Sequence, residues 1–211
     1  MIIGITGFIG SGKDTIADYL TTFHGYKRIS FAGTLKDAVA SVFGWDRELL
    51  EGTTTSSREW REQLDIWWSE RLNIPELTPR WVMQQWGTEV CREGFHNDIW
   101  VASVENQLRK ARDNIVITDC RFANEVNAIK NAGGITIRVE RGKRPEWYDS
   151  AVNYNKGPNG NIAWALSKIK LDKLKVHASE YSSVGLSYDH YIDNTGTIDN
   201  LHRQIEDLIN L

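Results

Sequence analysis

The chain has 211 residues, which fits one globular domain or one domain with an inserted subdomain. Hydrophobic residues make up 41% of it and charged residues 25%, a balance that is too apolar for general disorder. The formal net charge of −3 argues against nucleic acid as a main partner, and the 2 cysteines are too few for a disulfide framework.

The N-terminal residues alternate between strand and helix patterns. Residues 2–6 (IIGIT) predict a short buried strand, and a glycine-rich turn leads from it into a helix over about 14–23. A second strand is expected at 27–31. We expect Thr34 to cap the following helix, which ends at Gly44.

The segment 45–78 is more polar at its start and then rich in tryptophan. Ser56 and Glu59 mark a predicted helix start. This helix would carry three large apolar residues on one face, namely Trp60, Leu64 and Trp67. The nine tryptophans of the chain indicate either a large aromatic core or a stacking pocket, and composition does not choose between them.

The next helices have clear start signals. Thr78 and Pro79 predict a helix that ends at Gly87, because proline is favoured at the first helical position. Asn97 or Asp98 is expected to cap a further helix that runs to about residue 112.

The C-terminal part returns to alternating strands and helices. Strands are predicted at 114–119, 135–139 and 188–193, with a helix over about 123–132 and a last helix capped by Thr197. No element is predicted within 140–180. Because the strands alternate with helices, we expect an α/β fold with a parallel central sheet covered on both faces.

The strongest functional motif is Gly7-Phe-Ile-Gly-Ser-Gly-Lys13, which lies between the first predicted strand and its helix. Glycines let consecutive backbone N–H groups surround an anion, and the helix start adds a favourable dipole. Lys13 would place a positive charge between the terminal phosphates of a nucleotide. The alternative is a glycine-rich turn with a surface lysine. We give this alternative about one chance in twenty, which is how often the motif would arise by accident in a chain of this length.

The position after Lys13 departs from the common phosphate-loop pattern, in which a Ser or Thr binds Mg²⁺. Asp14 stands there and Thr15 follows. The metal ligand is therefore open between the Thr15 hydroxyl, the Asp14 carboxylate and a water held by either. GTPases are disfavoured because the chain has no Asn-Lys-x-Asp motif for reading the base.

Asp119 follows a strand-like apolar run, so we expect its carboxylate at the carboxyl edge of the sheet, where ligands of open α/β sheets bind. The alternative is that Asp119 caps a helix or pairs with Arg121 as part of the structure.

Eight blocks of the chain together resemble the bacteriophage-type deoxynucleoside monophosphate kinases, a family of P-loop kinases. The blocks are GSGKDT (10–15), FAGTLKDA (31–38), MQQWGTE (83–89), DIWV (98–101), VITDCRFANE (116–125), RVERG (138–142), HASE (177–180) and DNTGTI (193–198). They keep their order between residues 10 and 198, whereas 45–78 and 146–175 match poorly.

The resemblance implies a single three-layer α/β P-loop kinase domain over 1–211, with a helical acceptor-binding insert at about 45–97 and a lid within about 140–180. Its reaction would move the γ-phosphoryl group of ATP, with Mg²⁺, to the 5′-phosphate of a deoxynucleoside monophosphate. The donor would be bound by seven residues, namely Gly10, Ser11, Gly12, Lys13, Asp14, Thr15 and Asn194.

The acceptor nucleotide would be bound by eight residues, namely Lys36, Arg80, Gly87, Thr88, Trp100, Asp119, Arg121 and Glu125. Arg121 could grip the monophosphate with both arms of its guanidinium, and Trp100 could stack on the base or belong to the core. Lys13, Arg121 and the lid residue Arg141 are expected to be catalytic. His177 and Glu180 match the family but receive no role.

Two other readings stay open from the sequence. One is another small-molecule P-loop kinase, such as one that acts on dephospho-coenzyme A, and the other is a nucleotide-binding ATPase or switch that works through a protein partner. The base preference and oligomeric state, with a homodimer as one alternative, are also open. No uncharged run approaches membrane-spanning length, so we expect no membrane partner and a cytoplasmic location, which for a viral protein is the host cytoplasm.

Overall fold

The computed structural model describes residues 1–158 and 162–210. The chain divides into two compact units, of which the first comprises Met1–Ile29 with Leu108–Leu211 and the second Ser30–Gln107. The second unit contains the whole of the predicted insert at about 45–97. Within the predicted lid region, residues 159–161 lie outside the described residues. No helix of the described ranges is long and apolar enough to cross a membrane.

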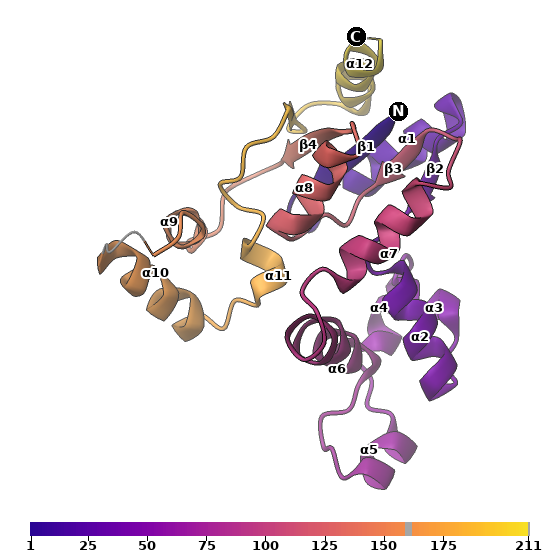
Figure 1. The fold of residues 1–211 in the computed structure, drawn as a ribbon, viewed down its shortest axis with the longest axis vertical. Coiled ribbons are helices and arrows are strands. Elements are labelled where there is room, and N and C mark those ends of the chain that lie inside the picture. Colours follow the sequence, from indigo (N-terminus) through magenta and orange to yellow (C-terminus); the bar gives the residue numbers. More distant parts are fainter. Residues whose placement is uncertain (159–161, 211) are drawn as a thin grey trace. The chain divides into compact units, whose positions relative to one another are not determined.

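A five-stranded parallel sheet forms the centre of the first unit, in the order β2-β3-β1-β4-β5 (Figure 1). The strands are β1 (Ile2–Thr6), β2 (Lys27–Ile29), β3 (Ile115–Ile117), β4 (Ile135–Glu140) and β5 (His190–Asp193). All five coincide with predicted strands to within two residues at each end. The expected parallel α/β fold is therefore confirmed.

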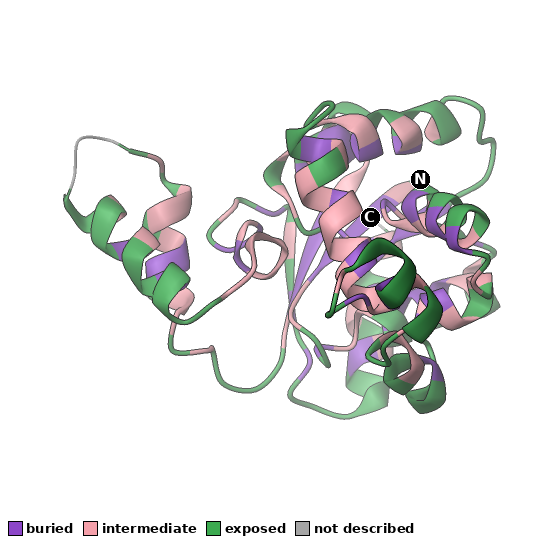
Figure 2. Cartoon of the chain, turned by 90° about the horizontal axis from the view of Figure 1, so that it is seen from below, coloured by how far each residue is buried: buried purple, intermediate pink, exposed green. Residues whose placement is uncertain are grey.

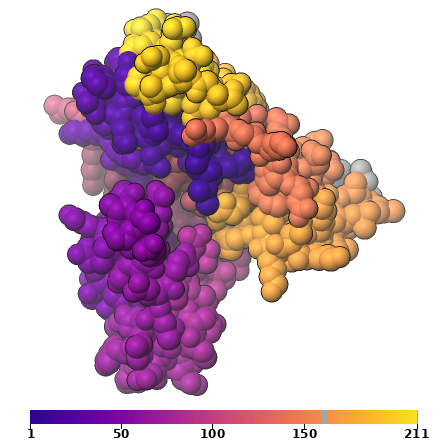
Figure 3. All heavy atoms as spheres, turned by 180° about the vertical axis from the view of Figure 1, so that it is seen from behind, coloured from indigo at the N-terminus to yellow at the C-terminus, as the bar shows by residue number. Residues whose placement is uncertain are grey.

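Helices cover both faces of this sheet. On one face α1 (Lys13–His24) and α12 (Ile198–Ile209) pack on Ile3 and Ile137, and Figure 3 shows yellow α12 against the indigo N-terminal segment. On the other face lies α8 (Ala123–Asn131). A Cβ on Gly4 would stand 2.9 Å from the Ile129 side chain, so Gly4 lets α8 approach β1 closely. The Thr197 side chain caps α12 as predicted.

The segment for which the sequence indicated no element contains three helices, α9 (Tyr148–Asn155), α10 (Ile162–Lys173) and α11 (Ala178–Tyr181). Helices α9 and α10 pack on each other as a pair, with buried Ala151 and Leu171 among the residues of their shared core (Figure 2). The ring of Phe8, in the loop after β1, also packs on this core.

The second unit is helical. Its elements are α2 (Gly33–Phe43), α3 (Arg47–Glu51), α4 (Thr55–Arg61), α5 (Ile66–Leu72), α6 (Pro79–Gln84), the π-helix η1 (Gln85–Glu93) and α7 (Ile99–Leu108). Six tryptophans share its core with Leu50 and Val82. Most of the tryptophan content of the chain therefore forms an aromatic core, one of the two alternatives that composition left open.

Three helix predictions in this unit are wrong at their ends. Thr34 does not cap α2, because Ala32 precedes its first residue, and the Thr34 hydroxyl instead lies 2.7 Å from that of Ser103. The helix capped by Thr78 does not end at Gly87 but continues as η1. Helix α7 ends at Leu108, short of the expected residue 112.

The predicted apolar face of Trp60, Leu64 and Trp67 does not exist as one helix face. Thr54 caps α4, which ends at Arg61, and the Asp65 side chain caps a separate helix, α5. Trp67 is 62% exposed, whereas Trp60 packs on the aromatic core. Two local capping signals at 54 and 65 thus outweighed the periodicity between them.

Candidate functional site

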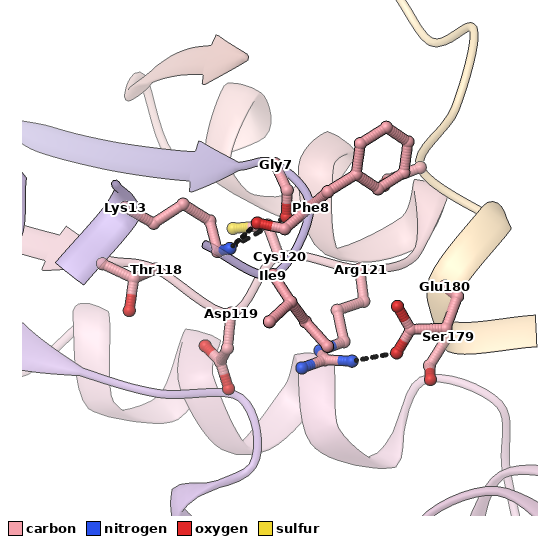
Figure 4. Close-up of a pocket in the computed structure, with 11 residues that line it drawn as sticks. Gly7, Phe8, Ile9, Lys13, Thr118, Asp119, Cys120, Arg121, Ser179 and Glu180 are labelled. Carbon is pink, nitrogen blue, oxygen red and sulfur yellow. Dashed lines mark hydrogen bonds and ion pairs between the residues drawn. The ribbon is translucent and has the colours of Figure 1, made fainter. Parts of the chain in front are cut away.

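A pocket lies at the carboxyl ends of β1 and β3, which are neighbours at the centre of the sheet. Three segments line it: the loop after β1 (7–9 with Lys13), the loop after β3 (118–121), and residues in and after α11 (Figure 4). The chain runs from β1 to one side of the sheet and from β3 to the other. Ligands of open α/β sheets bind at such a reversal of strand order.

The loop after β1 has the crowded backbone that a phosphate loop requires. Gly12 has φ 101°, and a Cβ there would stand 2.2 Å from the amide nitrogen of Asn194. A Cβ on Gly7 would stand 2.5 Å from the Ser11 hydroxyl oxygen. Helix α1 follows at once, and no side chain of the described residues caps its N-terminus. The start of α1 is therefore available to an anion, which its dipole favours.

The ammonium group of Lys13 lies over this loop, with its Nζ donating to the carbonyl oxygens of Gly7 and Phe8 at 2.9 Å each (Figure 4). Burial, with a further contribution from the nearby Arg121 guanidinium, lowers the pKa of Lys13 from 10.5 to about 8. A neighbouring polyanion would raise the pKa of this lysine again, because added negative charge favours its protonated form.

Arg121 enters the pocket from the loop after β3. Its guanidinium NH1 donates to Oε1 of Glu180 in α11 at 3.1 Å (Figure 4). The buried carboxylate of Glu125 accepts hydrogen bonds from the backbone N–H groups of Arg121 and Phe122, at 2.7 and 3.1 Å. Glu125 thus holds the loop that carries Arg121, and a direct substrate contact by its carboxylate stays a prediction.

The acidic residues of the site differ in their surroundings. Asp119 lines the pocket, whereas the exposed carboxylate of Asp14 pairs with the guanidinium of Arg28, which also donates to the Thr118 hydroxyl at 2.8 Å. Thr15 is exposed on α1. Arg28, which sequence reasoning missed, therefore competes with a metal ion for Asp14, and the metal-binding roles of Asp14 and Thr15 stay predictions.

In the described ranges no group of three or more His, Cys, Asp or Glu side chains could hold a metal ion. Mg²⁺ in kinases is held by one or two carboxylates together with substrate phosphates and water. The Asp119 carboxylate in the pocket fits that manner of binding. Burial, with a further contribution from the charge of Asp119, raises the pKa of the neighbouring Cys120 thiol well above its usual value, which disfavours the reactive thiolate.

Two further predicted residues meet the phosphate loop from distant parts of the sequence. Arg141, just after β4, donates from NH1 to the carbonyl oxygen of Gly10 at 3.5 Å. The amide of Asn194, after β5, donates to the carbonyl oxygen of Ser11 at 2.8 Å. The structure thus brings Gly10, Ser11, Arg141 and Asn194 together, and the hydrogen bond from Asn194 supports the backbone of the phosphate loop.

A sequence profile of the deoxynucleotide monophosphate kinases matches residues 63–153. A protein of Acanthamoeba polyphaga mimivirus that carries this name is 32% identical over 153 residues, which are 67% of this chain and 74% of the relative. The chain belongs to the deoxynucleotide monophosphate kinase family. It is therefore a phosphotransferase and a nucleotide kinase, as the phosphate loop and its pocket predict.

Further matches are more distant. The deoxynucleoside-5′-monophosphate kinase of Escherichia phage T5 is 24% identical over 186 residues, which are 65% of this chain and 74% of the relative. Among solved structures, a shikimate kinase of Aquifex aeolicus matches with a TM-score of 0.46 and 13% identity, covering 100% of this chain and 96% of its own. A dephospho-CoA kinase of Campylobacter jejuni matches with a TM-score of 0.41 and 16% identity, covering 99% and 95%.

Two cationic acceptor-site candidates of the kinase lie in the second unit and are ion-paired there. The ammonium Nζ of Lys36 in α2 lies 2.5 Å from Oε2 of Glu51 in α3. The guanidinium of Arg80 in α6 lies 3.2 Å from a carboxylate oxygen of Glu62. The Arg80 and Glu62 side chains are 42% and 58% exposed, and an ion pair in such surroundings contributes little to stability. Phosphate binding by Lys36 and Arg80 stays a prediction.

The other candidates of the second unit surround the π-helix. Trp100 is 8% exposed, lies in the aromatic core, and donates from its indole nitrogen to the carbonyl oxygen of Gly87 at 2.8 Å. Core packing is thus the alternative that the structure shows for Trp100, and a base contact by it stays a prediction. Gly87 and Thr88 lie within η1, and π-helical turns are frequent at functional sites of enzymes.

Sequence reasoning singled out His177 and Glu180 of the kinase without a role, and the structure gives one to each. The ring nitrogen Nδ1 of His177 accepts from the backbone N–H of Ser179 at 3.2 Å and so caps α11. Glu180 in that helix then holds Arg121. A His–x–x–Glu pattern before a short helix is a weak signal, because it does not reveal a partner about sixty residues away.

Proposed function

We propose that this kinase transfers the γ-phosphoryl group of ATP to the 5′-phosphate of a deoxynucleoside monophosphate and yields the diphosphate and ADP. The observation that carries the proposal is the pocket at the ends of β1 and β3, in which Lys13 and Arg121 come from neighbouring loops. Family membership supports a nucleotide acceptor, because relatives named for that acceptor match most of the chain.

The two cations divide the work in this proposal. Lys13, on the phosphate loop, binds the terminal phosphates of the donor, and Arg121 binds the acceptor phosphate with its guanidinium fork. The reaction requires little covalent participation by the protein, so alignment and charge neutralisation provide most of the rate. The acceptor phosphate is already an anion near neutral pH, and no residue has to remove a proton from it.

Residues around the two cations complete the arrangement. Arg141, whose guanidinium lies over the Gly10 carbonyl, would neutralise charge on the transferring group and close over it. Glu180 orients Arg121 before the acceptor arrives, at 3.1 Å. Mg²⁺ would shield the charge of the donor phosphates, with Asp119 as its carboxylate in the pocket. Lys36 and Arg80 in the second unit would add positive charge for the acceptor nucleotide.

A substrate panel tests the proposal. ADP release from ATP is measured by a coupled assay with each of the four deoxynucleoside monophosphates, the ribonucleoside monophosphates and dephospho-coenzyme A. Formation of the diphosphate is verified by chromatography, and Lys13→Met serves as the inactive control. We expect turnover with at least one deoxynucleoside monophosphate and none without an acceptor. Turnover only with dephospho-coenzyme A, or slow hydrolysis that ignores every acceptor, would contradict the proposal.

A further inference from the structure

An arginine occupies a core position in β4, behind the phosphate loop. Ile137 and Val139 in this strand face the apolar core formed with α1 and α12. Arg138 lies between them, so its side chain projects to the opposite face of the sheet. There it is 2% exposed, which is rare for arginine.

The buried guanidinium has an incomplete set of partners. Its carbon Cζ lies 4.7 Å from the centroid of the Phe8 ring, an attractive cation–π distance. Its NH1 donates to the hydroxyl oxygen of Ser183 at 3.4 Å, a long hydrogen bond. Its NH2 is buried, and no hydrogen-bond partner for it exists among residues 1–158 and 162–210. Across the part of the chain that the structure describes, Arg138 makes no ion pair with a carboxylate.

This incompleteness is not a general property of that face of the sheet. Two residues earlier in β4, the backbone N–H and the hydroxyl of Thr136 donate to a carboxylate oxygen of Asp189 at 2.8 and 2.7 Å. A buried charge without a carboxylate partner destabilises the folded protein. The cost at Arg138 therefore calls for a compensating gain elsewhere.

Both contacts of Arg138 lead to the pocket. Phe8 belongs to the phosphate loop, and its carbonyl oxygen accepts a hydrogen bond from Lys13. Ser183 lines the pocket on the side of α11, the helix that carries Glu180. The charge of Arg138 also contributes to the lowered pKa of Lys13, after burial and after the larger effect of Arg121. Arg138 is thus electrostatically coupled to the lysine without entering the pocket.

We propose that Arg138 is a positioning residue for the phosphate loop, which holds Phe8 and Ser183 in place and supplies positive charge from behind the loop to the donor phosphates. A polyanion that enters the pocket balances the charge of Arg138. The unfavourable burial of this charge in the free protein therefore increases the affinity for phosphate. This inference rests on the proposed function in so far as it takes the donor nucleotide to bind at this loop.

The test separates charge from shape at this position. Arg138→Met keeps a long side chain against Phe8 but removes the charge, and Arg138→Lys keeps the charge but loses the planar fork. The dissociation constants of adenosine, ADP and ATP are measured by competition with a fluorescent ATP analogue. Thr136→Val is the matched control, because it removes a buried polar group from the same face of the same strand.

We expect Arg138→Met to weaken ATP binding about tenfold and adenosine binding less than about twofold, because a buried charge acts in proportion to the charge of the ligand. Arg138→Lys should retain most of the ATP affinity, and Thr136→Val should leave the ratio of ATP to adenosine affinity as in the wild type. The melting temperature of Arg138→Met without nucleotide should equal or exceed that of the wild type.

Equal losses for adenosine and ATP in Arg138→Met, or no loss for either, would overturn the proposal. So would an Arg138→Lys protein that binds ATP as weakly as Arg138→Met. If the wild-type protein binds ATP no more tightly than adenosine, the phosphates of the donor nucleotide do not bind at this loop. That result would contradict the proposed function, and the two failures are therefore distinguishable.

Discussion

Replacement of Lys13 by methionine should abolish activity and yet stabilise the free protein. In the proposed reaction, Lys13 stabilises charge that develops between donor and acceptor, so its loss should lower kcat at least about a hundredfold. Stability should change in the opposite direction, because the folded protein holds this ammonium group in a partly buried site beside Arg121.

The size of the stability gain follows from the pKa of Lys13. One pKa unit corresponds to about 1.4 kcal/mol, so a pKa lowered from 10.5 to about 8 means that folding disfavours the charged lysine by about 3 kcal/mol. Methionine also loses the two hydrogen bonds to the Gly7 and Phe8 carbonyl oxygens. Each such bond is worth about 1 kcal/mol, so we expect a net gain of about 1–2 kcal/mol at pH 7.

The pH dependence provides an independent check. Below about pH 8 the lysine is charged in both states and the full cost of its burial is present. Between about pH 8 and 10.5 the folded protein has lost a proton that the unfolded chain still holds, so the stability of the wild type rises relative to Lys13→Met. The advantage of the variant should therefore shrink as the pH rises through this window.

The assay is urea unfolding of both proteins without nucleotide at pH 7.0 and at pH 9.5, followed by tryptophan fluorescence and circular dichroism. Lys13→Arg is the matched control, because it keeps the charge across both pH values. A Lys13→Met protein that is less stable than the wild type at pH 7 would refute the burial argument. Turnover within a few-fold of the wild type by a normally folded Lys13→Met protein would refute the phosphate-binding role.

Three other substitutions test neighbouring parts of the site. Lysine in Arg121→Lys cannot reproduce the guanidinium fork that Glu180 orients. The acceptor KM should therefore rise about tenfold and kcat should fall, while ATP affinity is retained. Calorimetry that shows lost ATP affinity and unchanged acceptor affinity would place Arg121 on the donor side. Arg141→Ala should lower kcat about tenfold with little change in acceptor Kd. In the wild type, residues 140–158 should gain hydrogen-exchange protection only when both ligands are bound. Near-normal turnover of the variant, together with hydrogen exchange that does not change on ligand binding, would make Arg141 a solvated surface charge. Asn194→Ala removes the amide that donates to the Ser11 carbonyl oxygen at 2.8 Å, so the free energy of unfolding should fall by about 1–2 kcal/mol and the KM for ATP should rise. An unchanged melting temperature would show that this contact does not support the loop.

The amino-acid sequence alone was enough to place the strands of the sheet and the phosphate loop. Runs such as 2–6 and 115–117 are apolar and β-branched, and buried strands of a parallel sheet have that pattern because helices cover both faces. The glycines and Lys13 were recognisable because a phosphate loop is contiguous in the chain. Caps such as Thr78 and Thr197 were equally clear, since a helix N-terminus needs a partner within three residues.

Local signals failed where one outweighed another or where none was present. The periodic tryptophans of 60–67 predicted a single helix, but Thr54 and Asp65 each supply a cap and divide the segment in two. Glycine at 87 predicted a helix end, yet the chain continues as a π-helix because Gly87 packs on Leu35 and its carbonyl oxygen accepts from the Trp100 indole. Trp100 lies 13 residues after Gly87 and Leu35 lies in an earlier helix, so no window of helix length contains all three residues.

The tertiary structure alone decided which charged groups meet in the pocket and which do not. Arg121 pairs with Glu180, Asp14 pairs with Arg28, and Asn194 supports Ser11, across sequence separations of 59, 14 and 183 residues. The sequence shows which residue types are present, but the strand order determines which loops share an edge. A charge such as that of Arg138 becomes costly, and therefore informative, only once folding has removed it from water and, among the residues that the structure describes, left its NH2 group without a hydrogen-bond acceptor.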